Sequence, residues 1–219
     1  IDVSGSMADE NRIEGARESA KVVLDSLKDD RDRLAIIPFS DKHFVLRPLD
    51  VLTATSRSTL QESLQGLRAG GGTLIGPPTV EALKLFAERH TDGARIVLIM
   101  TDGEDDEFQT HFESISKSCE QVGAQVHTIG FGQAVPPSAV ATLIDIANRC
   151  SGNYQFAPSN EELAKIFGSR VEETINESSL TYDSPYPEPD GLPRRATIRV
   201  KTPMGLIEST FNYQVGPIL

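Results

Sequence analysis

The run of apolar residues from Ile96 to Met100, in RIVLIMTDG, constrains the fold more than any other stretch of this 219-residue sequence. A strand with one face in water alternates apolar and polar side chains, whereas this strand is apolar on both faces. Other elements must therefore cover both faces. Such a strand is typical of a parallel sheet that is packed between two layers of helices.

Segments with helical periodicity alternate with short apolar strands along most of the sequence. Apolar residues at helical spacing predict helices that begin near Ile13, Ser58, Pro77, Phe108, Val140 and Leu163. The stretches RLAIIPFS, AQVHTIGFG and GNYQFA predict further strands between them. This alternation indicates an α/β fold with an open, doubly wound, mostly parallel sheet and helices on both faces.

One connection is too short for a parallel crossover. The stretch HFVLRPL, residues 43–49, follows RLAIIPFS after a turn at Ser40 and Asp41. Two strands joined so closely pair in the antiparallel direction. We therefore predict one antiparallel strand at the edge of the sheet.

The character of the sequence changes after Asn176. The proline-rich stretch SSLTYDSPYPEPDGLP is followed by ATIRVKT and LIESTFNYQV, two alternating stretches around PMG. This pattern predicts a linker and a β-hairpin. We expect an α/β domain over residues 1–178 and a separate segment over residues 179–219, whose hairpin either packs on the domain or begins a further β domain.

The net charge of −11 limits the classes of partner. Binding of nucleic acids depends on neutralising phosphates, so we expect no nucleic-acid partner. No apolar run is long enough to cross a bilayer, so we expect no direct membrane insertion in this segment.

Cys119 and Cys150 have no metal-ligand spacing, and they are either paired or reduced thiols at helix ends, with the reduced form favoured. The compartment is not indicated.

Three polar clusters are expected to meet at the carboxyl ends of the strands, where open α/β sheets bind ligands. They are DVSGS at residues 2–6, GGGTLIG at residues 70–76 and TDGEDD at residues 101–106. The side chains that offer oxygen atoms are Asp2, Ser4, Ser6, Thr73 and Asp102. Such oxygens select Mg²⁺, Mn²⁺ or Ca²⁺ over softer metals. Because the hydroxyls are neutral, the charge of the ion stays incompletely compensated, and an acidic partner can complete its coordination.

The Asp-x-Ser-x-Ser pattern, the threonine in a glycine-rich loop and the TDG stretch resemble the metal-ion-dependent adhesion site (MIDAS) of von Willebrand factor type A (VWA) domains. The resemblance covers about residues 1–178 and implies the Rossmann-like VWA fold. It implies that Ser4, Ser6 and Thr73 bind a divalent metal ion directly, with Asp2 and Asp102 close by, often through water. It also implies a non-catalytic module for protein-protein interaction, such as cell adhesion, in which a partner supplies a Glu or Asp carboxylate to Mg²⁺, Mn²⁺ or Ca²⁺.

Other interpretations of these residues are weaker. The residues 2–6 alone would fit a turn that caps a helix. Thr79 competes with Thr73, but the glycines around Thr73 allow close approach of the backbone and favour it. The acidic residues 104–106 would either add a second cation, tune the rim of the site or form a solvated loop, and the solvated loop is favoured.

Enzymatic interpretations lack essential parts. A nucleophilic serine needs a base within hydrogen-bond reach, and VSGSM lacks the G-x-S-x-G turn that exposes such a serine. Metal-assisted phosphoryl transfer would need a phosphate-binding motif, which we do not find. We therefore expect no catalysis. The alternative function is that of an accessory subunit of an AAA+ ATPase machine, as in the type A domains of metal chelatases and of machines that remodel complexes.

The start of the sequence departs from the VWA pattern. The first strand of the family is central and several residues long, whereas only Ile1 precedes Asp2 here. Loss of a central strand would expose the edges of its neighbours and remove much of the core. We therefore expect that the sequence is part of a larger chain, with further residues before Ile1.

Overall fold

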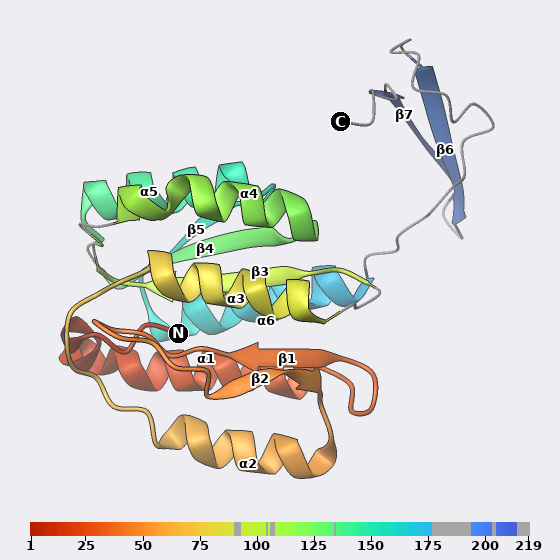
Figure 1. The fold of residues 1–219 in the computed structure, drawn as a ribbon. Coiled ribbons are helices and arrows are strands. Elements are labelled where there is room, and N and C mark those ends of the chain that lie inside the picture. The colour runs from red at the N-terminus through yellow and green to blue at the C-terminus, as the bar shows by residue number, and fades with distance from the viewer. Residues whose placement is uncertain are drawn as a thin grey trace. The chain divides into compact units, whose positions relative to one another are not determined.

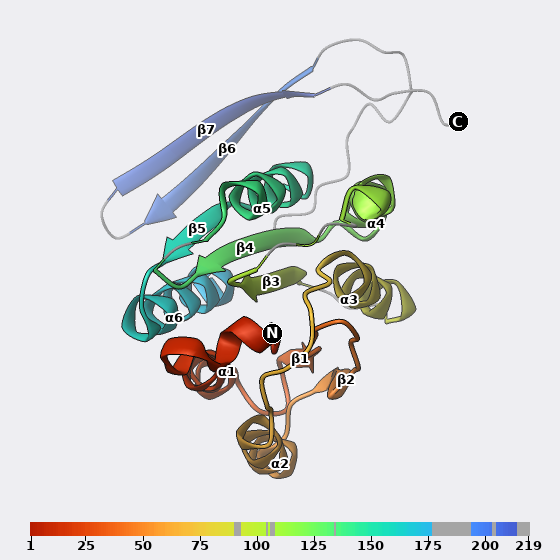
Figure 2. The ribbon, with the colours of Figure 1, turned by 90° about the vertical axis from the view of Figure 1, so that its left-hand side faces the viewer.

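A computed structural model describes residues 1–89, 93–103, 105, 108–133, 135–176, 194–202 and 205–213. The chain divides into two compact units, Ile1–Ser178 and Ser179–Leu219. Figures 1 and 2 show that the larger unit is built in layers, with strands between helices. Helices α1 (Arg12–Ser26) and α6 (Asn160–Asn176) pack together on one face, and α3 (Gly76–Glu88) and α4 (Phe112–Val122) pack together on the other.

The predicted parallel sheet is confirmed. Strands β3 (Ile96–Thr101), β4 (Gln125–Phe131) and β5 (Tyr154–Ala157) pair in parallel in the order β3-β4-β5. Consecutive residues of β3 point into different cores, because Ile99 packs with residues of α3, α4 and α5, whereas Met100 packs with residues of α1 and α6. This placement explains why the strand is apolar on both faces.

The antiparallel edge strand is present, but it begins later than predicted. Strand β1 (Arg33–Ile36) pairs with β2 (Arg47–Val51). The predicted strand began at residue 43, whereas Phe44 and Val45 lie in the connection with 54% and 36% of their surface exposed. Pro38 explains the difference in part, since it has no N–H for a ladder, and β1 ends before it.

Residues 1–3 hydrogen-bond to both groups of strands. On one side, Asp2 N–H donates to the carbonyl of Met100 in β3, at 3.2 Å. On the other side, Val3 N–H donates to the carbonyl of Phe39, which follows β1, at 2.8 Å. Phe39 N–H donates back to Ile1 O at 2.9 Å, and the pairing of Asp2 with Phe39 is parallel. These residues therefore occupy the position of a central strand between β1 and β3.

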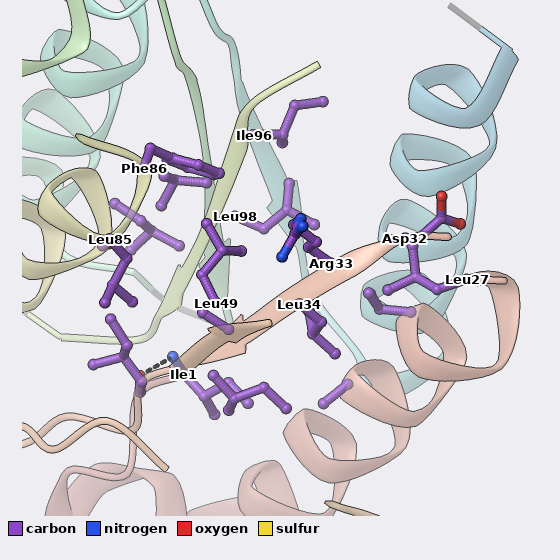
Figure 3. A pocket seen from close by; sticks show the side chains of 18 of the residues that line it. Ile1, Leu27, Asp32, Arg33, Leu34, Leu49, Leu85, Phe86, Ile96 and Leu98 are labelled. Atoms are coloured by element: carbon purple, nitrogen blue, oxygen red, sulfur yellow. Dashed lines mark hydrogen bonds between the residues drawn. The ribbon is translucent and has the colours of Figure 1, made fainter. Parts of the chain in front are cut away.

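A cavity of about 540 Å³ lies between β1 and β3, next to Ile1 (Figure 3). Its lining is mainly apolar and includes Leu34 of β1, Leu98 of β3 and Phe86 of α3. Because residues 1–3 run parallel to β1, an extended chain that continued backwards from Ile1 would run into this cavity.

The remaining helices follow the predicted periodicity. They are α2 (Ala54–Gln65) and α5 (Pro137–Arg149). The structure also contains two 3₁₀ segments: η1 (Gly5–Asn11), which was not predicted, and η2 (Phe108–His111), at the start of the helix predicted from Phe108. Among the described residues, we find no helix with both the length and the apolar character that a membrane span requires.

Cys119 of α4 and Cys150 at the end of α5 form a disulfide, so the expectation of reduced thiols is wrong. Their pairing depends on the packing of α4 beside α5, which the spacing of the cysteines does not reveal.

The smaller unit contains the predicted hairpin. Strand β6 (Arg194–Thr202) pairs antiparallel with β7 (Gly205–Tyr213), from Arg194 opposite Tyr213 to Thr202 opposite Gly205. The predicted linker, residues 179–193, lies outside the described residues.

Candidate metal centre

The three polar clusters meet where the central strand and β3 end. Residues 2–6 leave the central strand, the glycine-rich loop (residues 70–76) leads into α3, and residues 101–103 complete β3 and follow it. Gly5 N–H donates to the carbonyl of Gly71 at 2.9 Å, and Gly70 N–H donates to Val3 O at 2.8 Å. A Cβ atom on Gly5 would lie 3.3 Å from the Gly71 oxygen, so the two loops are in close backbone contact.

Asp2 is fully buried at the base of the cluster. One carboxylate oxygen, Oδ1, accepts the N–H of Ser4 at 2.7 Å, and Oδ2 accepts the hydroxyl of Thr101 at 2.5 Å. Burial raises the pKa of Asp2 above its ordinary value, and the charge of Asp102 adds to this, while the hydrogen bonds from Thr101 and Ser4 oppose it. The Thr101 hydroxyl also accepts the N–H of Gly103 at 3.1 Å, so Thr101 connects Asp2 to the loop that carries Asp102.

Ser4, Ser6 and Asp102 form a continuous chain of hydrogen bonds. The hydroxyl oxygens of Ser4 and Ser6 lie 3.1 Å apart, and the Ser6 hydroxyl donates to Asp102 Oδ1 at 2.7 Å. Ser4 and Asp102 are buried, whereas Ser6 is half-buried. The structure therefore brings Ser6 and Asp102, which are 96 positions apart in sequence, into direct contact.

Thr73 lies beside this chain. A Cβ atom on Gly103 would be 2.7 Å from the Thr73 hydroxyl oxygen, so this hydroxyl faces the backbone directly after Asp102. Thr79, the competing threonine, is buried in α3 and donates to the carbonyl of Ile75 at 2.7 Å. The geometry thus supports Thr73 as the threonine of the cluster.

Asp105 has a structural position that the sequence analysis missed. Its carboxylate Oδ2 is buried and accepts the N–H groups of Ile75 at 2.6 Å and of Gly76 at 3.0 Å. It therefore satisfies N–H groups at the start of α3 and connects the glycine-rich loop to the loop after β3. The preference for a solvated acidic loop is wrong for Asp105, while residues 104 and 106 lie outside the described residues.

Arg12 is a second member of the cluster that the sequence analysis missed. Its guanidinium Nη1 donates to Asp102 Oδ2 at 2.7 Å, and Nη2 donates to Glu10 Oε2 at 3.0 Å. Burial lowers the pKa of Arg12, but the hydrogen bonds and charges of Asp102 and Glu10 outweigh burial and raise it above its ordinary value. No motif predicted this contact, because it joins positions that are far apart in sequence.

The residues present fit a hard divalent cation. The candidate donors are two carboxylates and three hydroxyls, without sulfur or imidazole. In the part of the chain that the structure describes, no group of three or more His, Cys, Asp or Glu side chains gathers to hold a metal, so the hydroxyls would have to complete the donor set. Arg12 Nη1 already contacts Oδ2 of Asp102, and Oδ1 of Asp102 accepts the hydroxyl of Ser6.

The sequence matches the von Willebrand factor type A domain over residues 1–169. The chain belongs to this family. VWA domains often mediate protein-protein interaction or adhesion within larger proteins.

Relatives of this chain include larger proteins of several kinds. Calcium-activated chloride channel regulator 1 of Macaca mulatta is 27% identical over 190 residues, which cover 84% of this chain and 20% of the regulator. The chain thus spans about a fifth of the length of the regulators that it matches.

Solved structures share the fold. A VWA protein from Catenulispora acidiphila superposes with a TM-score of 0.70 at 23% identity, covering 81% of this chain and 42% of that one. Proximal thread matrix protein 1 from the mussel byssus, with a zinc-occupied MIDAS motif, gives a TM-score of 0.63 at 20% identity, covering 78% of this chain and 43% of that one. At such identities the likeness shows the fold alone.

Proposed function

We propose that this chain is a divalent-cation-dependent protein-interaction module. In this proposal Asp2, Ser4, Ser6, Thr73 and Asp102 hold the cation, and an acidic side chain of a protein partner binds to it. The observation that carries the proposal is the hydrogen-bonded chain from Ser4 through Ser6 to Asp102, with Thr73 beside it. Three separate segments of the sequence contribute to this cluster, in close backbone contact.

The proposed roles of the residues follow from their contacts. The hydroxyls of Ser4, Ser6 and Thr73 are neutral oxygen donors, so they bind a cation without cancelling its charge. Asp2 holds the backbone of Ser4, and Thr101 holds Asp2, so the two orient the first serine. Asp102 orients the hydroxyl of Ser6. The cation, when bound, supplies the positive charge that attracts a carboxylate of the partner.

The identity of the cation is part of the proposal. The oxygen donors favour Mg²⁺, Mn²⁺ or Ca²⁺. Zn²⁺ belongs in the same test, because a structural neighbour has a zinc-occupied MIDAS motif. An acidic partner fits better than a basic one, because a carboxylate can complete the coordination of a cation whose hydroxyl ligands are neutral.

Two threonines provide a matched pair of variants. Thr73→Val and Thr79→Val each remove one hydroxyl at nearly constant side-chain volume, but only Thr73 lies beside Asp102. We expect calorimetric titration with each of the four cations to show weaker binding for Thr73→Val and parental binding for Thr79→Val. Absence of binding by the parent for all four cations, or equal affinities of the two variants, would contradict the proposed centre.

A further inference from the structure

Arg12 stands at a position that local helix preferences do not favour. It is the first residue of α1, where the positive end of the helix dipole repels a cationic side chain. The preceding residues, Glu10 and Asn11, have φ angles of 50° and 59°, and Asn11 makes no side-chain cap. Two consecutive non-glycine residues in the left-handed region are unfavourable, so another interaction must hold Arg12 in place.

The contacts of the guanidinium supply that interaction. Asp102 accepts from it beyond the end of β3, and Glu10 accepts from it on the side of η1. A Cβ atom on Gly132, after the end of β4, would lie 3.0 Å from Arg12 Nε. The side chain of Arg12 is only 16% exposed, and that of Asp102 is 1% exposed. The guanidinium is thus held between η1 and the ends of two strands, against a candidate metal ligand.

Arg12 changes the charge of the metal centre. When Asp2, Asp102 and Glu10 are ionised, their three negative charges are offset in part by the one positive charge of Arg12, which contacts Asp102 and Glu10. A bound divalent cation then leaves these groups neutral overall. Without Arg12 they would keep one net negative charge. A positive charge at this position opposes binding of a cation and favours subsequent binding of an anion.

We propose that Arg12 sets the charge of the metal centre, so that it weakens binding of the cation and strengthens binding of a carboxylate to the loaded centre. This inference rests on the proposed function of the same centre. It assigns Arg12 as a specificity-determining residue for acidic partners. A purely structural role for Arg12 would instead weaken both binding steps together.

Two variants separate the charge of Arg12 from its packing. Arg12→Gln removes the charge and keeps a hydrogen-bond donor, while Arg12→Lys keeps the charge. Arg17→Gln is the matched control, because Arg17 lies on the same helix, is 12% exposed and pairs with Glu14 rather than with Asp102. If Arg12→Gln does not fold by circular dichroism, Arg12→Met serves as a second variant without the charge.

The first measurement is calorimetric titration with Mn²⁺. The second is titration of the Mn²⁺-loaded proteins with acetate at constant ionic strength, followed by water-proton relaxation, with acetate as the simplest carboxylate. We expect Arg12→Gln to bind Mn²⁺ at least about tenfold more tightly and acetate at least about tenfold more weakly than the parent. Arg12→Lys and Arg17→Gln should stay within about threefold of the parent in both titrations.

Failure of this inference can be distinguished from failure of the proposed function. If the parent does not bind Mn²⁺, or if Asp102→Asn binds it as the parent does, the metal centre itself is wrong. If the parent binds Mn²⁺ and Asp102→Asn does not, the centre stands. In that case, parental or weaker Mn²⁺ binding by Arg12→Gln, or acetate binding that is not weakened, overturns the role of Arg12.

Discussion

For a polypeptide that is made to begin at Ile1, acetylation of the Ile1 amine is expected to stabilise the fold, and most strongly at low pH. In such a 219-residue chain Ile1 is half-buried, and its amine donates to the carbonyl of Ile37 at 3.0 Å. Burial lowers the pKa of the Ile1 amine from 8.0 to about 5, although the nearby charge of Asp2 raises it. The folded state therefore disfavours the charged form, whereas the unfolded chain does not.

The sign and size of the effect follow from these values. Between pH 5 and pH 8 the unfolded chain binds more protons at this amine than the folded protein, so the free energy of unfolding rises with pH through this window. The cost of the buried amine is absent above pH 8 and reaches about 4 kcal/mol below pH 5, at about 1.4 kcal/mol for each pH unit. At pH 7 it is about 1.4 kcal/mol.

Acetylation replaces the amine by an amide and keeps the N–H that donates to Ile37. The acetyl group also adds a carbonyl oxygen, which can accept a hydrogen bond. The cavity beside Ile1 offers space for the added methyl group. An added hydrogen bond would stabilise the acetylated chain equally at every pH, so only the pH-dependent part reports the charge.

The assay is urea unfolding of the free and acetylated chains at several pH values between 5 and 8. All other groups titrate in both forms, so the difference between the two unfolding free energies isolates the amine. This difference should grow by about 3 kcal/mol from pH 8 to pH 5. Parallel loss of stability in both forms as the pH falls would refute the reasoning.

Three further predictions concern the disulfide, the core and the metal centre. Replacing Cys119 and Cys150 together by Ser should lower the free energy of unfolding by about 3–4 kcal/mol, because the disulfide closes a loop with a sequence separation of 31. A loss below about 1 kcal/mol in urea unfolding would contradict this expectation. Leu143→Ala, at a fully buried position, should cost about 2–5 kcal/mol, whereas Ile144→Ala, at a neighbouring position with 38% exposure, should cost about 1 kcal/mol or less in the same assay. The affinity for a metal ion should fall as the pH is lowered towards the raised pKa of Asp2, because a proton and a cation compete for this carboxylate. Calorimetric affinities that do not change with pH would count against Asp2 as a member of the centre.

The fold was largely predictable because its main signals are local. The apolar run of β3 required cover on both faces, and Ile99 and Met100 indeed point into separate cores. The start of β2 was misplaced, because the apolar residues Phe44 and Val45 fit a strand pattern although they are exposed. The disulfide was missed, because it depends on how two helices pack and not on any local pattern.

The candidate centre was predictable in part for the same reason. Short motifs and the rule that ligands bind at the carboxyl ends of strands selected its five residues, and their role as metal ligands stays a prediction. The two residues that were missed, Arg12 and Asp105, act through contacts with distant positions. Arg12 even breaks the local preferences for the start of a helix, and such departures concentrate at functional sites.

The hydrogen bonds of residues 1–3 have a consequence for how the domain opens. In the described part of the chain, β1 and β2 form one sheet, β3, β4 and β5 form another, and residues 1–3 hydrogen-bond to both. Strands that pair on both sides open last, and β4 lies between β3 and β5, so the amide protons of β1 should exchange with solvent before those of β4. Ser4 and Ser6 come directly after residues 1–3, which join the two sheets, and Asp102 comes directly after β3. A cation held by these residues would therefore join the two sheets, and its binding should slow amide exchange in β1 more than in β4.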